Sequence, residues 1–427
     1  MARPRILILL QNEPVPGDRH VWNQSTALVR AGYDVTVVCP TGTSRDRGEF
    51  EEIDGVTIHR YRPRTATGGT LDYGLEYLSA LWHMRRLARR LARRRPFDVV
   101  HACSPPDFLL LAALPLRRQG ARFIFDHHDL TPELFITRFG SPGGLLHRVT
   151  LAAEQVAFRL ADVVLSVNDS YRNVALTRGG RRPDDVLVVR TGPDLTRFTP
   201  TAPDPELKRG RPYLLSYVGV MGPQDGVDHA LRALAALRST RDDWHAIFMG
   251  DGDALADMRR LAVELGIEDV VEFTGWVEHD TIRRVLSTTD VGLAPDPKSP
   301  LNDVSSMIKI SEYMAMSVPI VSYNLAESQV GAGDAAVYAE ANDPTAFAER
   351  IGQLLDDPDR RRAMGTAGRA RAESFMAWEH QERALLAAYA RALALGPATD
   401  GVRRLLRGNR APAAAPPPEA APLVDIR

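Results

Sequence analysis

Residues 213–234 read YLLSYVGVMGPQDGVDHALRAL, and the order of patterns within them indicates the fold class. An apolar run comes first, a glycine-rich turn follows, and a helical pattern begins near Val227. The run is too uniformly apolar for a strand with one exposed face, so it predicts a parallel strand that is covered on both sides. A strand, a turn and a helix in this order form the repeating unit of a doubly wound α/β domain.

The same unit recurs on both sides of this stretch. Five more apolar runs follow it: HAIFM (245–249), DVVEFT (269–274), DVGLAP (290–295), VPIVSY (318–323) and AAVYA (335–339). Six precede the loop 191–212, which is rich in Pro, Asp and Thr: RILILL (5–10), DVTVVC (34–39), DVVHAC (98–103), RFIFD (122–126), DVVLSV (162–167) and DVLVVR (185–190). The pattern predicts an α/β protein with two doubly wound, Rossmann-like domains that face a cleft.

We place the domain boundaries at the changes in this pattern. The N-terminal domain is expected over 1–193 and the C-terminal domain over 194–372. A helix within 373–395 is expected to pack back towards the N-terminal domain. The tail 396–427 is rich in Ala and Pro, as 11 of the 12 residues from 411 to 422 show. Such a composition predicts disorder.

Composition indicates an ordinary globular protein of 427 residues, with 44% hydrophobic and 25% charged residues. No run approaches 18 apolar residues, so we expect no membrane-spanning helix. The two cysteines, Cys39 and Cys103, lie in strand-like runs, which favours a reducing compartment and predicts no cysteine metal site. A cytoplasmic location is expected. Charge is unevenly distributed, because residues 1–200 carry 28 arginines and no lysine against 21 acidic residues.

The segment SPLNDVSSMIKISEYMAMSVPIVSYN (299–324) holds the strongest candidate for a ligand site. Ser305 and Ser306 offer N-caps for a helix that runs to about Met316. Lys309, one of only three lysines, and Glu312 then share one face of that helix. A helix N-terminus with a nearby lysine suits a phosphate, and a carboxylate one turn further suits a ribose. The alternative is a surface Glu–Lys pair of little energetic weight.

This segment resembles the nucleotide-binding signature of the retaining GT-B glycosyltransferases of the family 4 type, in the branch that reads K-I-x-E-Y-M-A. The resemblance extends over about residues 3–395 and includes Phe375 and Trp378 at the final helix. It implies that Glu312 holds the ribose of a nucleotide sugar and that Lys309 lies near the diphosphate. At the position where the family signature has its first acidic residue, this chain has Val304.

Two glycine turns belong to the same candidate donor site. Gly219 and Gly222 follow one strand and let the backbone approach a ligand closely. The family commonly places Arg and Lys in this turn, at positions that hold Val220 and Asp225 here. The second turn contains Gly250, without the third glycine of a dinucleotide fingerprint, which argues against NAD.

Further along, the resemblance makes Trp276 and Val277 candidate contacts for the nucleotide base. The alternative for Trp276 is a buried residue that only packs.

In the N-terminal half, the run RFIFDHHDLTPELF (122–135) places Asp and His at the carboxyl end of a strand. His128 and Asp129 match the His–Asp pair of the family, in which the histidine lies near the donor sugar. The alternative is structural capping. Adjacent strand residues point to opposite faces, so we expect no metal here. Arg19 is a candidate for binding an acceptor phosphate, or is a solvated arginine at a helix start.

The expected function is transfer of a sugar, with retention of anomeric configuration, from a nucleotide sugar to a glycan, a lipid-linked saccharide or a small molecule. The alternatives are a sugar-nucleotide epimerase of the same fold and a non-catalytic nucleotide-sugar-binding protein. We expect no cofactor and no nucleic-acid partner. Within residues 73–95, arginines fan over one face of an expected helix, which suggests peripheral contact with an anionic membrane.

Overall fold

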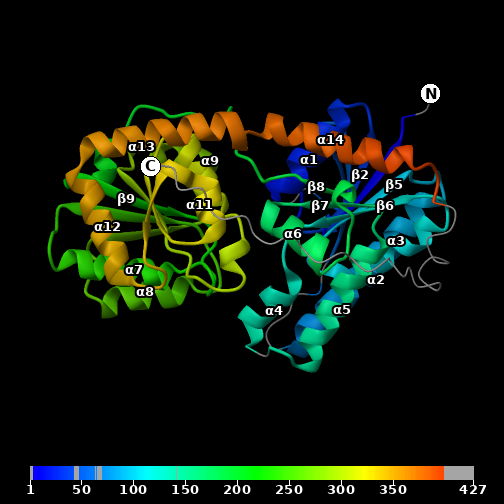
Figure 1. Ribbon diagram of the computed structural model, residues 1–427, viewed down its shortest axis with the longest axis horizontal. Helices are drawn as coiled ribbons and strands as arrows, with labels where there is room; N and C mark the ends of the chain where they lie inside the picture. Colours follow the sequence, from blue (N-terminus) through cyan, green and yellow to red (C-terminus); the bar gives the residue numbers. More distant parts are fainter. Residues whose placement is uncertain (1–2, 43–47, 63, 65–69, 141, 399–427) are drawn as a thin grey trace, which may run out of the picture.

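The computed structural model describes residues 3–42, 48–62, 64, 70–140 and 142–398, which form two α/β halves (Figure 1). The N-terminal sheet has the strand order β3-β4-β2-β1-β5-β6-β7-β8. Its strands are β1 (Arg5–Leu9), β2 (Asp34–Pro40), β3 (Phe50–Ile53), β4 (Val56–Tyr61), β5 (Val99–Cys103), β6 (Arg122–His127), β7 (Val163–Ser166) and β8 (Val186–Val188). All neighbouring strands run parallel except β3 and β4.

The C-terminal sheet is parallel and has the strand order β11-β10-β9-β12-β13-β14. Its strands are β9 (Tyr213–Val218), β10 (Trp244–Met249), β11 (Val271–Gly275), β12 (Val291–Ala294), β13 (Ile320–Tyr323) and β14 (Ala336–Ala339). This is the 3-2-1-4-5-6 order of a Rossmann fold, whose ligand crevice lies where the order reverses. That position is the carboxyl ends of β9 and β12.

The predicted strands are confirmed, and the structure adds the hairpin β3–β4, which the sequence analysis missed. Its strands are short, and β3 alternates between exposed and half-buried residues, so neither forms a long apolar run. The sequence of the turn between β3 and β4 does favour a hairpin. Asp54 and Gly55 both have positive φ, at 49° and 76°, and Asp-Gly is a favoured pair for a two-residue hairpin turn.

Helices cover both faces of each sheet (Figure 1). In the N-terminal half α1 and α14 bury their apolar residues on one face, and α2, α3, α5 and α6 cover the other. The N-terminal helices are α1 (Arg19–Arg30), α2 (Thr70–Ala92), α3 (Leu110–Arg117), α4 (Thr131–Phe139), α5 (Leu145–Leu160) and α6 (Asp169–Thr177). The others are α7 (Val227–Arg238), α8 (Leu255–Glu264), α9 (His279–Thr288), α10 (Ile308–Ala315), α11 (Ala326–Ala332), α12 (Pro344–Asp356), α13 (Pro358–Arg371) and α14 (Trp378–Ala394).

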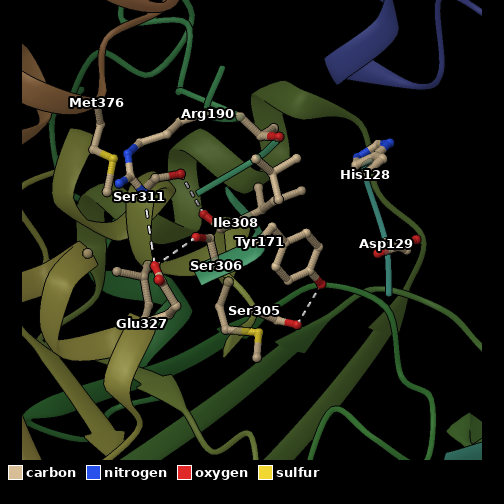
Figure 2. Close-up of a pocket in the computed structure, with 15 residues that line it drawn as sticks. His128, Asp129, Tyr171, Arg190, Ser305, Ser306, Ile308, Ser311, Glu327 and Met376 are labelled. Atoms are coloured by element: carbon tan, nitrogen blue, oxygen red, sulfur yellow. Dashed lines mark hydrogen bonds and ion pairs between the residues drawn. The ribbon is translucent and has the colours of Figure 1, made fainter. Parts of the chain in front are cut away.

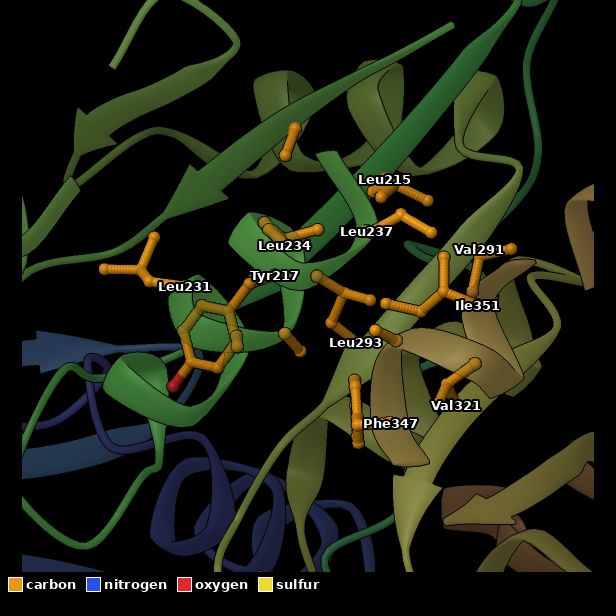
Figure 3. Close-up of a cluster of buried hydrophobic side chains, with 14 of the residues drawn as sticks. Leu215, Tyr217, Leu231, Leu234, Leu237, Val291, Leu293, Val321, Phe347 and Ile351 are labelled. Atoms are coloured by element: carbon orange, nitrogen blue, oxygen red, sulfur yellow. The ribbon is translucent and has the colours of Figure 1, made fainter. Parts of the chain in front are cut away.

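One core of the C-terminal half lies between the sheet and helices α7, α8 and α12 (Figure 3). Leu215 and Leu293 of the sheet meet Leu234 of α7 and Ile351 of α12 there, all fully buried. Each buried leucine or isoleucine contributes roughly 1.5–3 kcal/mol to stability. This packing fixes β9 and β12 beside each other, and with them the loops that follow both strands.

The final helix returns to the N-terminal half. Leu385 and Tyr389 of α14 are fully buried in the core beneath β1, β5 and β7. Helix α14 spans Trp378–Ala394, within the range 373–395 in which a helix was expected. The expected disordered tail, 396–427, lies outside the described residues from residue 399 onward. Within the described residues, no helix is long and apolar enough to cross a membrane.

Candidate active site

The glycine turns after β9 and β10 lie against each other. A side chain at Gly250 would collide with the carbonyl oxygen of Gly219, and both residues have a φ near +140°, which L side chains rarely adopt. The Gly222 N–H donates to the Asp225 carboxylate at 2.8 Å, which closes the first turn. The two turns therefore expose backbone at the carboxyl edge of the sheet, where a ligand can approach closely.

Helix α10 carries Lys309 and Glu312 to this edge, but its start differs from the prediction. The helix begins at Ile308 with Met307 as its N-cap residue, and no side chain caps it. Ser305 and Ser306 lie in the segment between the 3-10 turn Asn302–Val304 and the helix, so the predicted serine caps are wrong. The two serines instead contact the N-terminal half.

Lys309 is buried and paired in this structure. Its Nζ donates to Asp296 Oδ1 at 2.6 Å and lies 5.2 Å above the ring of Tyr217. Burial alone would lower the pKa of Lys309, but Asp296 and Asp225 outweigh it and raise that pKa. Burial, together with Asp296, raises the pKa of Asp225 to about 6 against the opposing effect of Lys309. One lysine thus faces two carboxyl groups where the family resemblance implies a diphosphate.

Glu312 lies one turn further along α10 and is half-buried. Burial raises its pKa to about 7, while Lys309 and Arg19 favour its ionised form. Arg19 is the first residue of α1, in the N-terminal half. Arg19 interacts electrostatically with Glu312 and with Arg197.

Trp276 directly follows β11, and its exposed fraction is 49%. The interpretation of Trp276 as a buried packing residue is therefore wrong. Val277 packs against the core that contains Val218 and Met249. The position of Trp276 is compatible with contact to a nucleotide base.

A cavity of about 130 Å³ lies between the two halves (Figure 2). His128, Asp129 and Tyr171 line it from the N-terminal half, and Ser305 and Ser306 line it from the C-terminal half. Whole-ligand pockets usually have about 300–1,000 Å³, so this cavity has room for one small group and not for a nucleotide sugar. The structure therefore brings four predicted site residues together in one cavity, while Lys309 and Glu312 do not line it.

Hydrogen bonds close the two halves on each other at this cavity. Asn168 Nδ2 donates to the Val304 carbonyl at 2.9 Å and to Ser306 Oγ at 3.0 Å. Tyr171 and Ser305 share a hydroxyl hydrogen bond of 3.0 Å, and Ser170 donates to buried Glu327. The sequence analysis missed Asn168, Tyr171 and Glu327. Asn168 could have been found as an N-cap just after a strand, because such positions lie at the ligand edge of the sheet.

His128 and Asp129 follow β6 at the edge of the cavity. The His128 backbone N–H donates to Ser104 Oγ at 3.1 Å, and that hydroxyl donates to the Asp129 carbonyl at 3.2 Å. Burial raises the pKa of Asp129, although His128 and His127 oppose this effect. The loop is thus fixed through its backbone, and His128 and Asp129 line one side of the cavity (Figure 2).

A mixed group of potential metal ligands lies beneath this loop. One side-chain atom each of His101, Cys103 and Asp126 lies within 4.8 Å of the others. This group was not predicted from the two cysteines, because Cys103 and Asp126 become direct neighbours only through the pairing of β5 with β6. His101 and Gln24 already approach Asp126 Oδ2 at 3.2 and 3.0 Å, and we interpret the group as a hydrogen-bonded cluster.

Fold and site together define a GT-B glycosyltransferase: two Rossmann-like halves, with glycine turns and a Lys–Glu helix at the crevice of the second. Comparison with known families agrees. Residues 17–197 match Glycosyltransferase Family 4, and residues 212–357 match Glycosyl transferases group 1. These two matches cover most of the chain, which therefore belongs to the group 1 and family 4 glycosyltransferases that use nucleotide sugars.

Individual relatives are distant but aligned over most of their length. The chain is 27% identical to a glycogen synthase of Mycobacterium tuberculosis, over 84% of this chain and 87% of that protein. It is 26% identical to a 2-deoxystreptamine glucosyltransferase of Streptomyces kanamyceticus, over 87% and 98%.

Solved structures share the fold. Sucrose-phosphate synthase of Thermosynechococcus elongatus has a TM-score of 0.74 at 18% identity, over 92% of this chain and all of that one. The Anabaena protein HepE in complex with UDP-glucose has a TM-score of 0.66 at 15% identity, over 90% and 99%.

Proposed function

We propose that this glycosyltransferase binds its nucleotide sugar against α10 and the glycine turns, and transfers the sugar with retention of anomeric configuration. The observation that carries the proposal is the position of Glu312. Its carboxyl group lies half-buried beside Lys309 at the carboxyl edge of a Rossmann sheet, opposite Arg19 of the other half. An ionised carboxylate there can accept hydrogen bonds from both ribose hydroxyls.

The diphosphate is proposed to lie over the turn of Gly219 and Gly222, near Lys309. Backbone N–H groups of such a turn bind phosphate oxygens without a side chain. Lys309 already shares its charge with Asp296, so we infer that the backbone N–H groups of the turn supply much of the attraction for phosphate. Trp276 is proposed to contact the base.

His128 and Asp129 are proposed to contact the donor sugar from the N-terminal half. Both side chains reach the cavity between the halves, where one small group fits. In a retaining transfer the leaving diphosphate can itself accept the proton of the acceptor, so electrostatic stabilisation of that group is the main requirement. No metal is assigned a role in this proposal.

Two partners are proposed on the acceptor side. Arg19 can bind a phosphate of an acceptor that enters between the halves. Helix α2 can contact an anionic membrane that carries a lipid-linked acceptor, because Arg86, Arg89 and Arg90 are exposed beside Leu78 and Trp82, which are 60% and 57% exposed. We further propose that the protein is cytoplasmic and acts in polysaccharide biosynthesis.

A ligand panel tests the donor site. Thermal unfolding with UDP, GDP, dTDP and ADP identifies the base, since a ligand at 100 times its Kd adds about 2.7 kcal/mol. The matching nucleotide sugars are then incubated with a panel of saccharide and lipid-linked acceptors. We expect release of the nucleoside diphosphate with a new glycosidic product. An epimerised sugar would identify an epimerase, and tight binding without any turnover would identify a non-catalytic binding protein.

A further inference from the structure

A row of buried polar side chains leads from α14 to His128. The hydroxyl of Tyr389 lies 2.7 Å from His101 Nδ1, and His101 Nε2 lies 3.2 Å from Asp126 Oδ2. The same carboxylate oxygen lies 3.2 Å from His20 Nε2. All four residues are buried. They come from α14, β5, β6 and α1, so four separate elements meet at this carboxylate.

His20 is held at both ring nitrogens. Its Nδ1 lies 2.9 Å from Thr191 Oγ1, and its Nε2 lies 2.6 Å from the amide of Gln24. A ring with two partners has one orientation, because rotation would break both hydrogen bonds. The Gln24 amide also donates to Asp126 Oδ2 at 3.0 Å, so Gln24, His20 and His101 all meet at this carboxylate oxygen.

Charge supports this arrangement. Burial alone would raise the pKa of Asp126, yet His20 and His101 hold it well below its usual range, so the carboxyl group is an anion. An ionised carboxylate accepts stronger hydrogen bonds than a neutral group. Asp126 therefore anchors the donors that surround it.

The outer face of the His20 ring supports His128. The two ring centroids are 4.4 Å apart, with the planes inclined by 34°. Among the described residues, no side chain hydrogen-bonds the His128 ring, whose loop is fixed through its backbone alone. The His20 ring therefore limits where the His128 ring can point.

We propose that His20 is a positioning residue, fixed by Asp126 and Thr191, that orients the His128 ring towards the cavity between the two halves. This inference rests on the proposed contact of His128 with the donor sugar. Thr191 belongs to the segment that leads into the C-terminal half, and Tyr389 to the helix that returns from it. The orientation of His128 is thereby coupled to both connections between the halves.

The test combines a spectroscopic readout with a double-mutant cycle. The His128 imidazole is identified in a heteronuclear NMR spectrum as the signal that His128→Ala removes. His20→Ala and Thr191→Val should shift or broaden that signal, and Thr191→Ser should restore it because the hydroxyl is kept. The matched control is His245→Ala, since His245 is equally buried but lies on β10 of the other half. An unchanged His128 signal in His20→Ala would overturn the proposal.

Turnover is measured as nucleoside diphosphate release from UDP-glucose or GDP-mannose, whichever matches the base that the thermal panel selects. His20→Ala should lower kcat about 10- to 100-fold with donor affinity preserved, as misplacement of a reacting group does. In the His128→Ala background the same substitution should have no further effect. Multiplicative losses in the double variant would overturn the coupling.

Two further outcomes separate the competing explanations. If His128→Ala alone leaves turnover intact, the proposed contact of His128 fails, whereas the NMR readout still decides whether His20 orients the ring. Metal analysis of the purified full chain decides the nature of the cluster. One zinc per chain that is lost in Cys103→Ser but kept in Cys39→Ser would replace the hydrogen-bonded account with a metal site.

Discussion

At the scale of single residues, the proposed donor site holds three carboxyl groups around one lysine. Asp225 and Asp296 both favour the charged form of Lys309 and offset its positive charge with their own negative charges, and Glu312 shares the same face of α10. The family that this chain resembles commonly has Arg and Lys in the turn of Gly219 and Gly222, at the positions where this chain has Val220 and Asp225. The balance of charge at the site is thus less favourable to a diphosphate, and it changes with pH.

We expect nucleoside binding to depend on pH through the protonation of Glu312. With a pKa of about 7, Glu312 loses its charge below neutral pH, so affinity for the nucleoside should fall between pH 8 and pH 6. Glu312→Gln should bind at least about tenfold more weakly at pH 8, because a charged hydrogen bond contributes roughly 1.5–3 kcal/mol. Calorimetry across this range checks both. An unchanged affinity in Glu312→Gln would remove Glu312 from the site.

The same group affects stability in the opposite sense. Its pKa is higher in the folded than in the unfolded state, so its contribution is fully present at low pH and is lost as pH rises through about 7. Glu312→Gln should therefore raise Tm of the free protein at pH 8 and leave it nearly unchanged at pH 5. Differential scanning calorimetry at the two pH values measures this, and an equal Tm change at both would contradict it.

Replacement of Asp225 is expected to strengthen binding of the nucleoside diphosphate. Asp225→Asn removes a negative charge beside Lys309 while an amide oxygen can still accept the Gly222 N–H. At pH 8 the variant should bind the nucleoside diphosphate several-fold more tightly, with nucleoside affinity unchanged, as one less charge in a partly buried site predicts. Glu264→Gln, an exposed change on α8, is the control. Weaker diphosphate binding in Asp225→Asn would show that the carboxylate itself assists binding.

At the scale of elements, α2 separates its apolar and basic faces. Met84 and Ala88 are fully buried in the N-terminal core, whereas Arg89 and Arg90 are exposed. Co-sedimentation with anionic vesicles should be lost when Arg89, Arg90, Arg93 and Arg94 become Gln, since each contributes about 1 kcal/mol near an anionic surface. Replacement of the exposed Arg350, Arg360 and Arg362 of the other half by Gln is the control. Absence of wild-type binding at low salt would end the membrane proposal.

The elements also show what the sequence could predict. Long apolar runs such as 213–218 gave correct strands because both faces of these strands are buried. The start of α10 was misplaced, because Ser305 and Ser306 satisfy partners 134 and 138 residues away in the chain and not their own helix. The pairing of Lys309 with Asp296 was also missed, because the two residues, 13 apart in the sequence, meet only through the way the connection between β12 and α10 folds back.

At the scale of the whole molecule, direct hydrogen bonds hold the two halves closed around the cavity. Tyr171→Phe with Ser306→Ala removes hydrogen bonds between the halves and leaves the Asn168 cap of α6 intact. The double variant should show a larger radius of gyration by small-angle scattering, while Tm falls only slightly because each net hydrogen bond contributes about 1 kcal/mol. Ser311→Ala, whose hydroxyl bonds within its own helix, is the control. An unchanged radius would mean that other contacts hold the closed state.

We propose that a donor bound at Glu312 of the C-terminal half reacts with retention of configuration. NMR spectroscopy of donor hydrolysis tests it without a known acceptor, because the first-formed free sugar reports the configuration before it mutarotates. With an α-linked donor such as UDP-glucose, we expect the α-anomer of the sugar first, and Glu312→Ala should abolish its formation at low donor concentration. Appearance of the β-anomer first would contradict the account.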